Sequence, residues 1–140
     1  MKKYIAVLSL LCILSAPVSA ETCANGAGTV IYGNDVDPAT GFEGTRYCKS
    51  NITMNWWSAF AWCDAIGGEL IDLTKECLKS TGTSACPNLA GKGSGGVWTQ
   101  NVPNNQQAYG VDLGSGGIKL GNRSTSNGGV QYALCVDFQK

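Results

Sequence analysis

The chain has 140 residues, with 10 basic and 10 acidic side chains, 19 glycines and no histidine. This length favours a single domain, and the lack of a basic tract beyond the N-terminus argues against nucleic acid or an anionic membrane as a partner. Histidine is the commonest general acid–base group at neutral pH and a frequent metal ligand. Its absence leads us to expect a protein that is not an enzyme and that needs no metal or cofactor.

Residues 1–20 have the layout of a secretory signal peptide. The three parts are a positive start, an apolar run and a small-residue cleavage site: Lys2 and Lys3, Ile5 to Leu14, and Val18-Ser19-Ala20. The apolar run is too short to span a bilayer comfortably, so a retained anchor is the weaker alternative. Cleavage leaves one domain over residues 21–140, with 8 basic and 10 acidic residues and a net charge of −2. We expect a secreted or cell-envelope protein with no membrane insertion after signal removal.

Six of the seven cysteines remain after cleavage, since Cys12 lies in the leader. An even number of cysteines in a small exported chain favours disulfides over metal ligation. Cys77 and Cys86 flank a Gly-, Ser- and Thr-rich segment, and we expect them to close a local loop. With all six in bridges, no free thiol is left as a nucleophile.

An N-terminal strand and hairpin extension is predicted over residues 21–46. The β-branched run Gly28 to Tyr32 predicts one strand, and Thr45 to Cys48 predicts a second. The segment between them, Asn34 to Gly41, is rich in turn residues and is expected to be a solvated loop. Three acidic residues lie in or beside it, without the alternation and closing glutamate of an EF-hand: Asp35, Asp37 and Glu43.

A tryptophan-rich helix is predicted next, and the rest of the chain must pack around it. Its buried face is expected to consist of residues at helical spacing: Trp56, Ala59, Cys63 and Ile66. Thr53 or Asn55 can cap its start, because a short side-chain oxygen there accepts from an unpaired backbone N–H. Gly67 and Gly68 are expected to end it, since glycine enters the left-handed conformation without penalty.

A short apolar segment, Leu70 to Leu73, is expected to return along this helix. Thr74 to Lys79 predicts a second, short helix with Thr74 as its cap. Pro87 to Gly96 is predicted to be a surface loop, because it contains mainly Gly, Asn, Ser and Lys with little apolar content.

The last third of the chain predicts an antiparallel sheet. The expected strands are Gly96 to Thr99, Ala108 to Leu113, Ile118 to Leu120, and Val130 to Val136. In the second of these strands Tyr109, Val111 and Leu113 alternate onto one face, and Gly114 to Gly117 makes the following turn.

Arg46 to Val136 resembles the C-type-lectin-like fold, in particular its small secreted bacterial members. The motifs that carry the resemblance are Tyr47-Cys48-Lys49, Asn55-Trp56-Trp57, Trp98 after a long loop, and Cys135 near the end. The resemblance implies an α+β fold of two short helices, antiparallel sheets and long loops, stabilised by disulfides. It also implies that the helix cysteine bonds the cysteine of the last strand.

The disulfide pairing that follows is Cys63–Cys135, Cys77–Cys86 and, as the remainder, Cys23–Cys48. Closing a loop of about 70 residues stabilises a fold by about 4 kcal/mol in the chain-entropy account, and the local pair gives about 3 kcal/mol. Six cysteines allow many other connectivities, so the pairing stays a hypothesis at this point.

Sugar-binding members of that family hold calcium with a Glu-Pro-Asn or Gln-Pro-Asp motif and a Trp-Asn-Asp motif. Here the nearest match is Val102-Pro103-Asn104, and Trp-Asn-Asp is absent. Between Thr83 and Asp137 only Asp112 offers a carboxylate, whereas calcium needs six to eight oxygens. We therefore expect no calcium site of the family type.

Recognition is expected to use the long loops beside the final sheet, because loops on a rigid scaffold commonly carry binding residues. The candidate ligand-binding residues are Asn101, Asn104, Asn105, Gln106, Gln107, Arg123 and Asn127. The alternative is that these are only solvated turns. Trp57 and Trp62 could be exposed stacking platforms, but we expect both to lie in the core.

The expected function is recognition or adhesion at the cell surface, with a glycan or protein as the ligand. The alternative is a non-catalytic structural subunit of a surface appendage or envelope assembly. A third possibility is a hydrolase that uses a carboxylate pair, Asp64 with Glu69 or Glu69 with Asp72. We favour capping or solvated roles for these pairs, because both lie at a helix end and its return.

Overall fold

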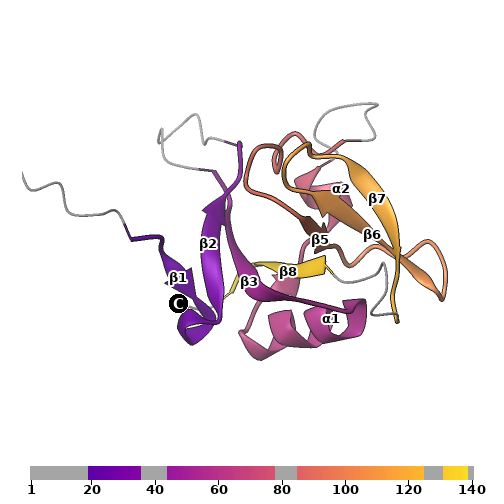
Figure 1. The fold of residues 1–140 in the computed structure, drawn as a ribbon, viewed down its shortest axis with the longest axis horizontal. Helices are drawn as coiled ribbons and strands as arrows, with labels where there is room; N and C mark the ends of the chain where they lie inside the picture. The colour runs from indigo at the N-terminus through magenta and orange to yellow at the C-terminus, as the bar shows by residue number, and fades with distance from the viewer. Residues whose placement is uncertain (1–18, 36–43, 78–84, 125–130, 139–140) are drawn as a thin grey trace, which may run out of the picture.

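The computed structural model describes residues 19–35, 44–77, 85–124 and 131–138. Over these ranges the fold is α+β, with two α-helices, a short 3-10 helix and a mixed sheet of eight strands (Figure 1). The helices are η1 (Ala24–Gly26), α1 (Trp56–Ala65) and α2 (Leu73–Glu76). The strands are β1 (Thr22–Cys23), β2 (Gly28–Tyr32), β3 (Arg46–Met54), β4 (Glu69–Leu70), β5 (Gly96–Trp98), β6 (Gln107–Asp112), β7 (Ile118–Asn122) and β8 (Gln131–Val136).

The last strand in the sequence lies in the middle of the sheet. The strand order is β1-β2-β3-β8-β5-β6-β7, and β4 also pairs with β8. Strand β8 runs antiparallel to β3 and β4 but parallel to β5, so the sheet is mixed. The predicted antiparallel pairing is found for every other pair of described strands, and β5–β8 is the exception. Strands β5 and β8 are separated by the β6–β7 hairpin, so no tight turn fixes their relative direction.

Helix α1 begins and ends where the sequence predicts. The Asn55 side chain accepts a hydrogen bond from the Ser58 backbone N–H at 2.8 Å, and Gly67 adopts a φ of 73° just after the helix. Trp56, Ala59 and Cys63 are buried, as expected, and Ile66 is half-buried. The alternative cap, Thr53, instead lies in β3.

Strand β2 has the bounds that its β-branched run predicts, but β3 continues six residues beyond the predicted Cys48 to Met54. The extension pairs with β8 at Thr53 and Met54, after an irregularity that follows Lys49. Its residues 51–53 are exposed, so the apolar alternation that marks a strand is missing there. A distant partner strand, rather than the local pattern, determines this part of β3.

Helix α2 is capped by Asp72 and not by the predicted Thr74. The Asp72 side chain accepts from the Thr74 backbone N–H at 2.8 Å, which places Asp72 at the position before the first helical residue. Of the predicted helix Thr74 to Lys79, the last two residues lie outside the described residues.

Three disulfides cross-link the described part of the chain, two over long sequence separations and one locally. They link β1 to β3, α1 to β8, and the end of α2 to the following loop: Cys23–Cys48, Cys63–Cys135 and Cys77–Cys86. These are the three pairs predicted from the sequence, with Cys23–Cys48 as the pair left over after the other two. Such bonds indicate an oxidising, extracytoplasmic setting. Within the described ranges, no helix is long and apolar enough to cross a membrane.

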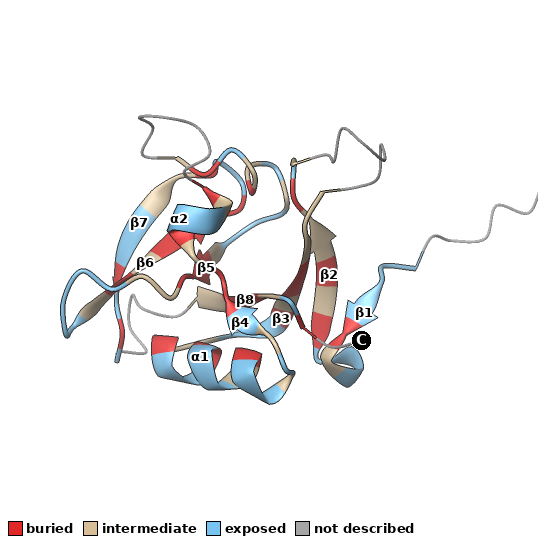
Figure 2. Ribbon diagram, turned by 180° about the vertical axis from the view of Figure 1, so that it is seen from behind, coloured by how far each residue is buried: buried red, intermediate tan, exposed pale blue. Residues whose placement is uncertain are grey.

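The core has two main parts, on opposite sides of the central strands. Helix α1 lies on one side of β8 and α2 on the other (Figures 1 and 2). Trp98 of β5 packs with α1, whereas its neighbour Val97 packs with Leu73 of α2, as strand alternation requires. On β6, Tyr109, Val111 and the following Leu113 share the α2 side, as predicted.

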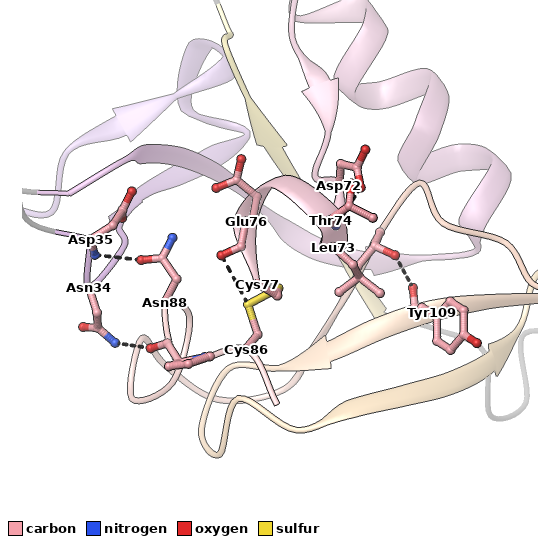
Figure 3. Close-up of a disulfide and its surroundings, with 12 residues drawn as sticks. Asn34, Asp35, Asp72, Leu73, Thr74, Glu76, Cys77, Cys86, Asn88 and Tyr109 are labelled. Atoms are coloured by element: carbon pink, nitrogen blue, oxygen red, sulfur yellow. Dashed lines mark hydrogen bonds between the residues drawn. A yellow bond between two sulfur atoms is a disulfide. The ribbon is translucent and has the colours of Figure 1, made fainter. Parts of the chain in front are cut away.

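The Pro87 to Gly96 segment is not simply a surface loop. Leu89 is fully buried in the core, and the loop is tied to the segment after β2. The Asn34 side chain donates to the Pro87 and Ala90 carbonyls at 2.7 and 2.9 Å, and Asn88 accepts from the Asp35 N–H at 2.8 Å (Figure 3). A buried leucine and these three hydrogen bonds thus help to hold the glycine-rich loop against the segment after β2.

Candidate functional site

Three segments of the chain meet at Arg123, directly after β7. The Arg123 backbone N–H donates to the Gln106 carbonyl at 2.8 Å, and its carbonyl accepts from the Trp56 N–H at 3.3 Å. The end of β7, the β5–β6 loop and the start of α1 are therefore held together by main-chain hydrogen bonds. This places side chains from all three segments on one part of the surface.

The Arg123 side chain packs against the first two helix residues. Its guanidinium carbon lies 3.9 Å from the ring centroid of Trp56 and 4.1 Å from that of Trp57, and the two rings meet edge to face. Arg123 is only 9% exposed. Its Nη1 donates to the Asn105 carbonyl at 3.5 Å. The guanidinium thus links the aromatic start of α1 to the loop by cation–π contacts.

Trp57 faces solvent, which corrects the prediction that it lies in the core. It is 56% exposed, and Phe60, one helical turn further, is 48% exposed. Successive helix residues point about 100° apart, so Trp56 and Trp57 cannot both face the sheet. Trp62 is half-buried and packs against the core.

Asn101, a predicted ligand-binding residue, holds the start of α2. Its Oδ1 accepts from the Leu73 backbone N–H at 2.8 Å, and its Nδ2 donates to the Asp72 carboxylate at 3.1 Å. Both ends of the amide are thus used inside the protein.

Asn104 shapes the loop that carries it. Its Oδ1 accepts from the backbone N–H groups of Gln106 and Gln107 at 2.9 Å each, and its Nδ2 donates to the Gln107 side chain at 2.9 Å. The side chains of Asn105 and Gln106 are exposed and make no hydrogen bond with any described residue. Asn127 lies outside the described residues.

The structure therefore divides the predicted binding residues into two groups. Asn101, Asn104 and Gln107 are engaged within the fold, while the remaining described residues join a surface that we call the α1–loop face. This face consists of Trp57, Phe60, Asn105, Gln106 and Arg123. Of its two aromatic members, Trp57 is predicted from the sequence to lie in the core, with exposure as the alternative, and Phe60 receives no surface role there, whereas both are exposed. Neither is one of the residues that the helical spacing predicts for the buried face of α1. This spacing could have indicated from the sequence that both face solvent.

The carboxylate pairs considered for hydrolysis lie in different settings. Asp64 and Glu69 line an open cavity of about 260 Å³ together with Phe60, Gly68, Leu70 and Gln100. Asp72 instead points to the start of α2. Partial burial acts to raise the pKa of Asp72, but hydrogen bonds from Thr74 and Asn101 outweigh it and hold the pKa below its ordinary value.

Asp112, the one carboxylate between Thr83 and Asp137 in the sequence, holds the β6–β7 turn. It accepts from the backbone N–H groups of Gly114 and Ser115 at 3.0 and 2.9 Å and forms an ion pair with Lys119 at 3.2 Å. The Ser115 N–H above all, with Lys119, lowers the pKa of Asp112 to about 2. No group of three or more His, Cys, Asp or Glu residues able to hold a metal ion occurs in the described part of the chain.

The three acidic residues in or beside the predicted Asn34 to Gly41 loop, Asp35, Asp37 and Glu43, precede β3. The Asp35 carboxylate accepts from the Thr45 backbone N–H at 3.0 Å, and hydrogen bonds hold its pKa low against the opposing effect of burial. Asp37 and Glu43 lie outside the described residues.

No family model matches this chain, and no curated protein matches it.

Proposed function

We propose that this chain is a secreted or cell-envelope recognition module of C-type-lectin-like fold. It binds a glycan or a protein ligand through the α1–loop face, without calcium and without catalysis. The fold assignment is supported by a disulfide between the first long helix and the last strand, and by long loops around the sheet. The extracellular or envelope location is supported by the three disulfides and by the predicted leader.

The observation that carries this proposal is the exposure of Trp57 and Phe60 beside two uncommitted amides. An exposed indole offers a flat apolar surface, and amide groups supply both donors and acceptors. Asn105 and Gln106 lie on the same loop that Arg123 fixes to α1. Polar recognition groups are thus presented beside an aromatic surface on a rigid base, which is the usual composition of a binding site.

A calcium-independent mode is supported by the contacts of Asp112, the one carboxylate between Thr83 and Asp137. Asp112 already accepts hydrogen bonds from its own turn and pairs with Lys119. Recruiting it to a metal would break these contacts. Ligand contacts on the α1–loop face therefore come from aromatic rings, amides and the guanidinium.

The second candidate function is a structural subunit of an envelope or surface assembly. It is favoured by exposed apolar side chains that are not members of the α1–loop face, namely Ile52 at 70% and Leu120 at 52%. Leu120 lies on β7, which ends the strand order and has an unpaired edge among the described strands. Such an edge can accept a strand from another chain.

The experiment that tests the proposal combines a glycan array with a pull-down from envelope and culture fluid. The mature protein, residues 21–140, is applied in calcium and in chelator, beside Trp57→Ala and the matched control Ile52→Ala. We expect a ligand whose retention survives chelation, drops at least about tenfold with Trp57→Ala, and is unchanged with Ile52→Ala. A blank array together with a stoichiometric partner lost only by Ile52→Ala would favour the structural subunit instead.

A further inference from the structure

The Arg123 guanidinium has more hydrogen-bond donors than the fold uses. An arginine carries five N–H donors. Arg123 makes one side-chain hydrogen bond with the described residues, from Nη1 to the Asn105 carbonyl, and at 3.5 Å it is long. Its Nε is buried and has no partner. Its Nη2 has no partner among the described residues either and, unlike Nε, is not fully buried, so solvent reaches it.

Arg123 also forms no ion pair with any residue that the structure describes. The ion pairs in the described part of the chain are Arg46 with Glu21 and Lys119 with Asp112. Burying a cation without an anion costs free energy, and the two indole rings compensate for this only in part. The Nε–Nη2 edge is therefore a site that lacks an acceptor, on a residue that is about nine-tenths buried.

We propose that the Nε–Nη2 edge of Arg123 binds the carboxylate of an acidic saccharide, an inference that rests on the proposed recognition function and names its ligand class. A carboxylate has two oxygens at the spacing of two parallel guanidinium N–H groups, so the contact is bidentate. One oxygen meets Nη2, which solvent reaches, and the other reaches Nε once the atoms that cover it move aside, so binding supplies the buried Nε with its acceptor and the cation with its counter-charge.

The surroundings of this edge favour a sugar acid over other carboxylates. The Trp57 indole packs on the guanidinium and is still 56% exposed, so a sugar ring can stack on it while the ring's carboxylate reaches Arg123. Hexuronic and nonulosonic acids carry their carboxylate directly on the ring, at the short reach that this arrangement requires. The free amides of Asn105 and Gln106 lie beside it and are suited to sugar hydroxyls.

The test presents the mature protein with matched pairs of saccharides. Each acidic glycan on the array, uronic or nonulosonic, is paired with its carboxyl-reduced counterpart, and sulfated neutral glycans form a third arm. We expect at least about tenfold weaker binding to the reduced form. Arg123→Lys keeps the charge but loses the planar fork, and should weaken binding of the acidic form about tenfold or more while leaving the reduced form unaffected. Lys119→Ala, which removes an exposed cation from β7, is the control for non-specific attraction of acidic ligands and should change neither.

A measurement on the unmodified protein guards against variants that do not fold. In ¹⁵N-edited NMR spectra, the acidic saccharide should shift the Arg123 Nε–H resonance, and the carboxyl-reduced saccharide should leave it unchanged. Equal binding of both forms, or equal binding of sulfated glycans, overturns the carboxylate inference and leaves the recognition function standing. A blank array with a protein captured through Trp57 overturns only the sugar-acid ligand, whereas no glycan and no captured partner overturns both proposals.

Discussion

Two adjacent tryptophans at the start of α1 have opposite roles. Trp56 is 6% exposed, and its indole N–H donates to the Thr99 carbonyl at 2.8 Å, so it ties the helix to the segment after β5. Trp57 is more than half exposed and contacts Arg123. The comparison teaches that residue type does not decide between core and surface here. The direction of each side chain from the helix axis decides it.

The same contrast recurs between two asparagines of the β5–β6 loop. Asn101 uses both ends of its amide to hold the start of α2, whereas the exposed Asn105 side chain makes no hydrogen bond with the described residues. The inward members of each pair build the scaffold and the outward members are free to bind. Replacing an inward residue should therefore lower stability, and replacing an outward residue should weaken ligand binding.

The largest effect is expected from removing the bond that holds the inner face of α1. Cys63→Ala combined with Cys135→Ala opens a bridge of sequence separation 72 and should lower the free energy of unfolding by about 4 kcal/mol. Urea unfolding measures the change. The local pair, Cys77→Ala with Cys86→Ala, has a separation of 9 and should cost less, about 3 kcal/mol. Equal losses would show that loop length does not set the difference.

The next effect tests the tryptophan pair directly. Trp56→Ala leaves a cavity beside Trp98 and removes a buried hydrogen bond, so we expect a loss of about 3 kcal/mol in unfolding free energy. Trp57→Ala should cost under about 1 kcal/mol, because most of its surface is already in water. Thermal and urea unfolding of both variants give the comparison. A larger loss for Trp57→Ala than for Trp56→Ala would contradict our division of the helix.

A smaller effect is expected in the asparagine pair. Asn101→Ala leaves the Leu73 N–H without its acceptor and Asp72 without one donor, and should destabilise the fold by about 1–2 kcal/mol. Asn105→Ala should stay within about 0.5 kcal/mol of the parent. Denaturant midpoints of the two variants measure these changes in stability. Ligand retention should instead fall more with Asn105→Ala than with Asn101→Ala.

The smallest effect concerns the β6–β7 turn and depends on pH. The folded pKa of Asp112, about 2, lies below its ordinary value of 3.8, so ionised Asp112 favours the folded state above 3.8 and this contribution is lost as the pH falls towards 2. Asp112→Asn should therefore lower the melting temperature slightly at neutral pH, and the difference from the parent should vanish near pH 2. A difference that stays constant over this range would rule out the carboxylate charge as its source.

Local chemistry was sufficient to predict several elements. The β-branched run of β2, the Asn55 cap and the glycine stop after α1 each act within a few residues, and their predictions are confirmed. The second half of β3 could not be found in this way, because residues 51–53 are exposed and their strand conformation depends on β8. Leu89 was missed for a similar reason, since a single apolar residue in a polar loop carries no periodic signal.

The candidate site was only partly predictable. Asn105, Gln106 and Arg123 were identified as loop residues with suitable side chains, but composition could not show that Asn101 and Asn104 are engaged within the fold. That distinction depends on which backbone N–H groups lie within reach, such as the Leu73 N–H at 2.8 Å. Trp57 was assigned to the core because a large indole usually lies there. Its position one residue after the buried Trp56, and therefore about 100° around the helix, was the better guide to its exposure.

The central position of β8 has a consequence for how the protein is made. Strands β3, β4 and β5 all pair with it, and Cys63 finds its partner there. While a nascent chain still lacks residues 131–136, the middle of its sheet cannot form and its longest disulfide loop cannot close. The middle of the sheet and the longest disulfide loop therefore form only after β8 has been synthesised.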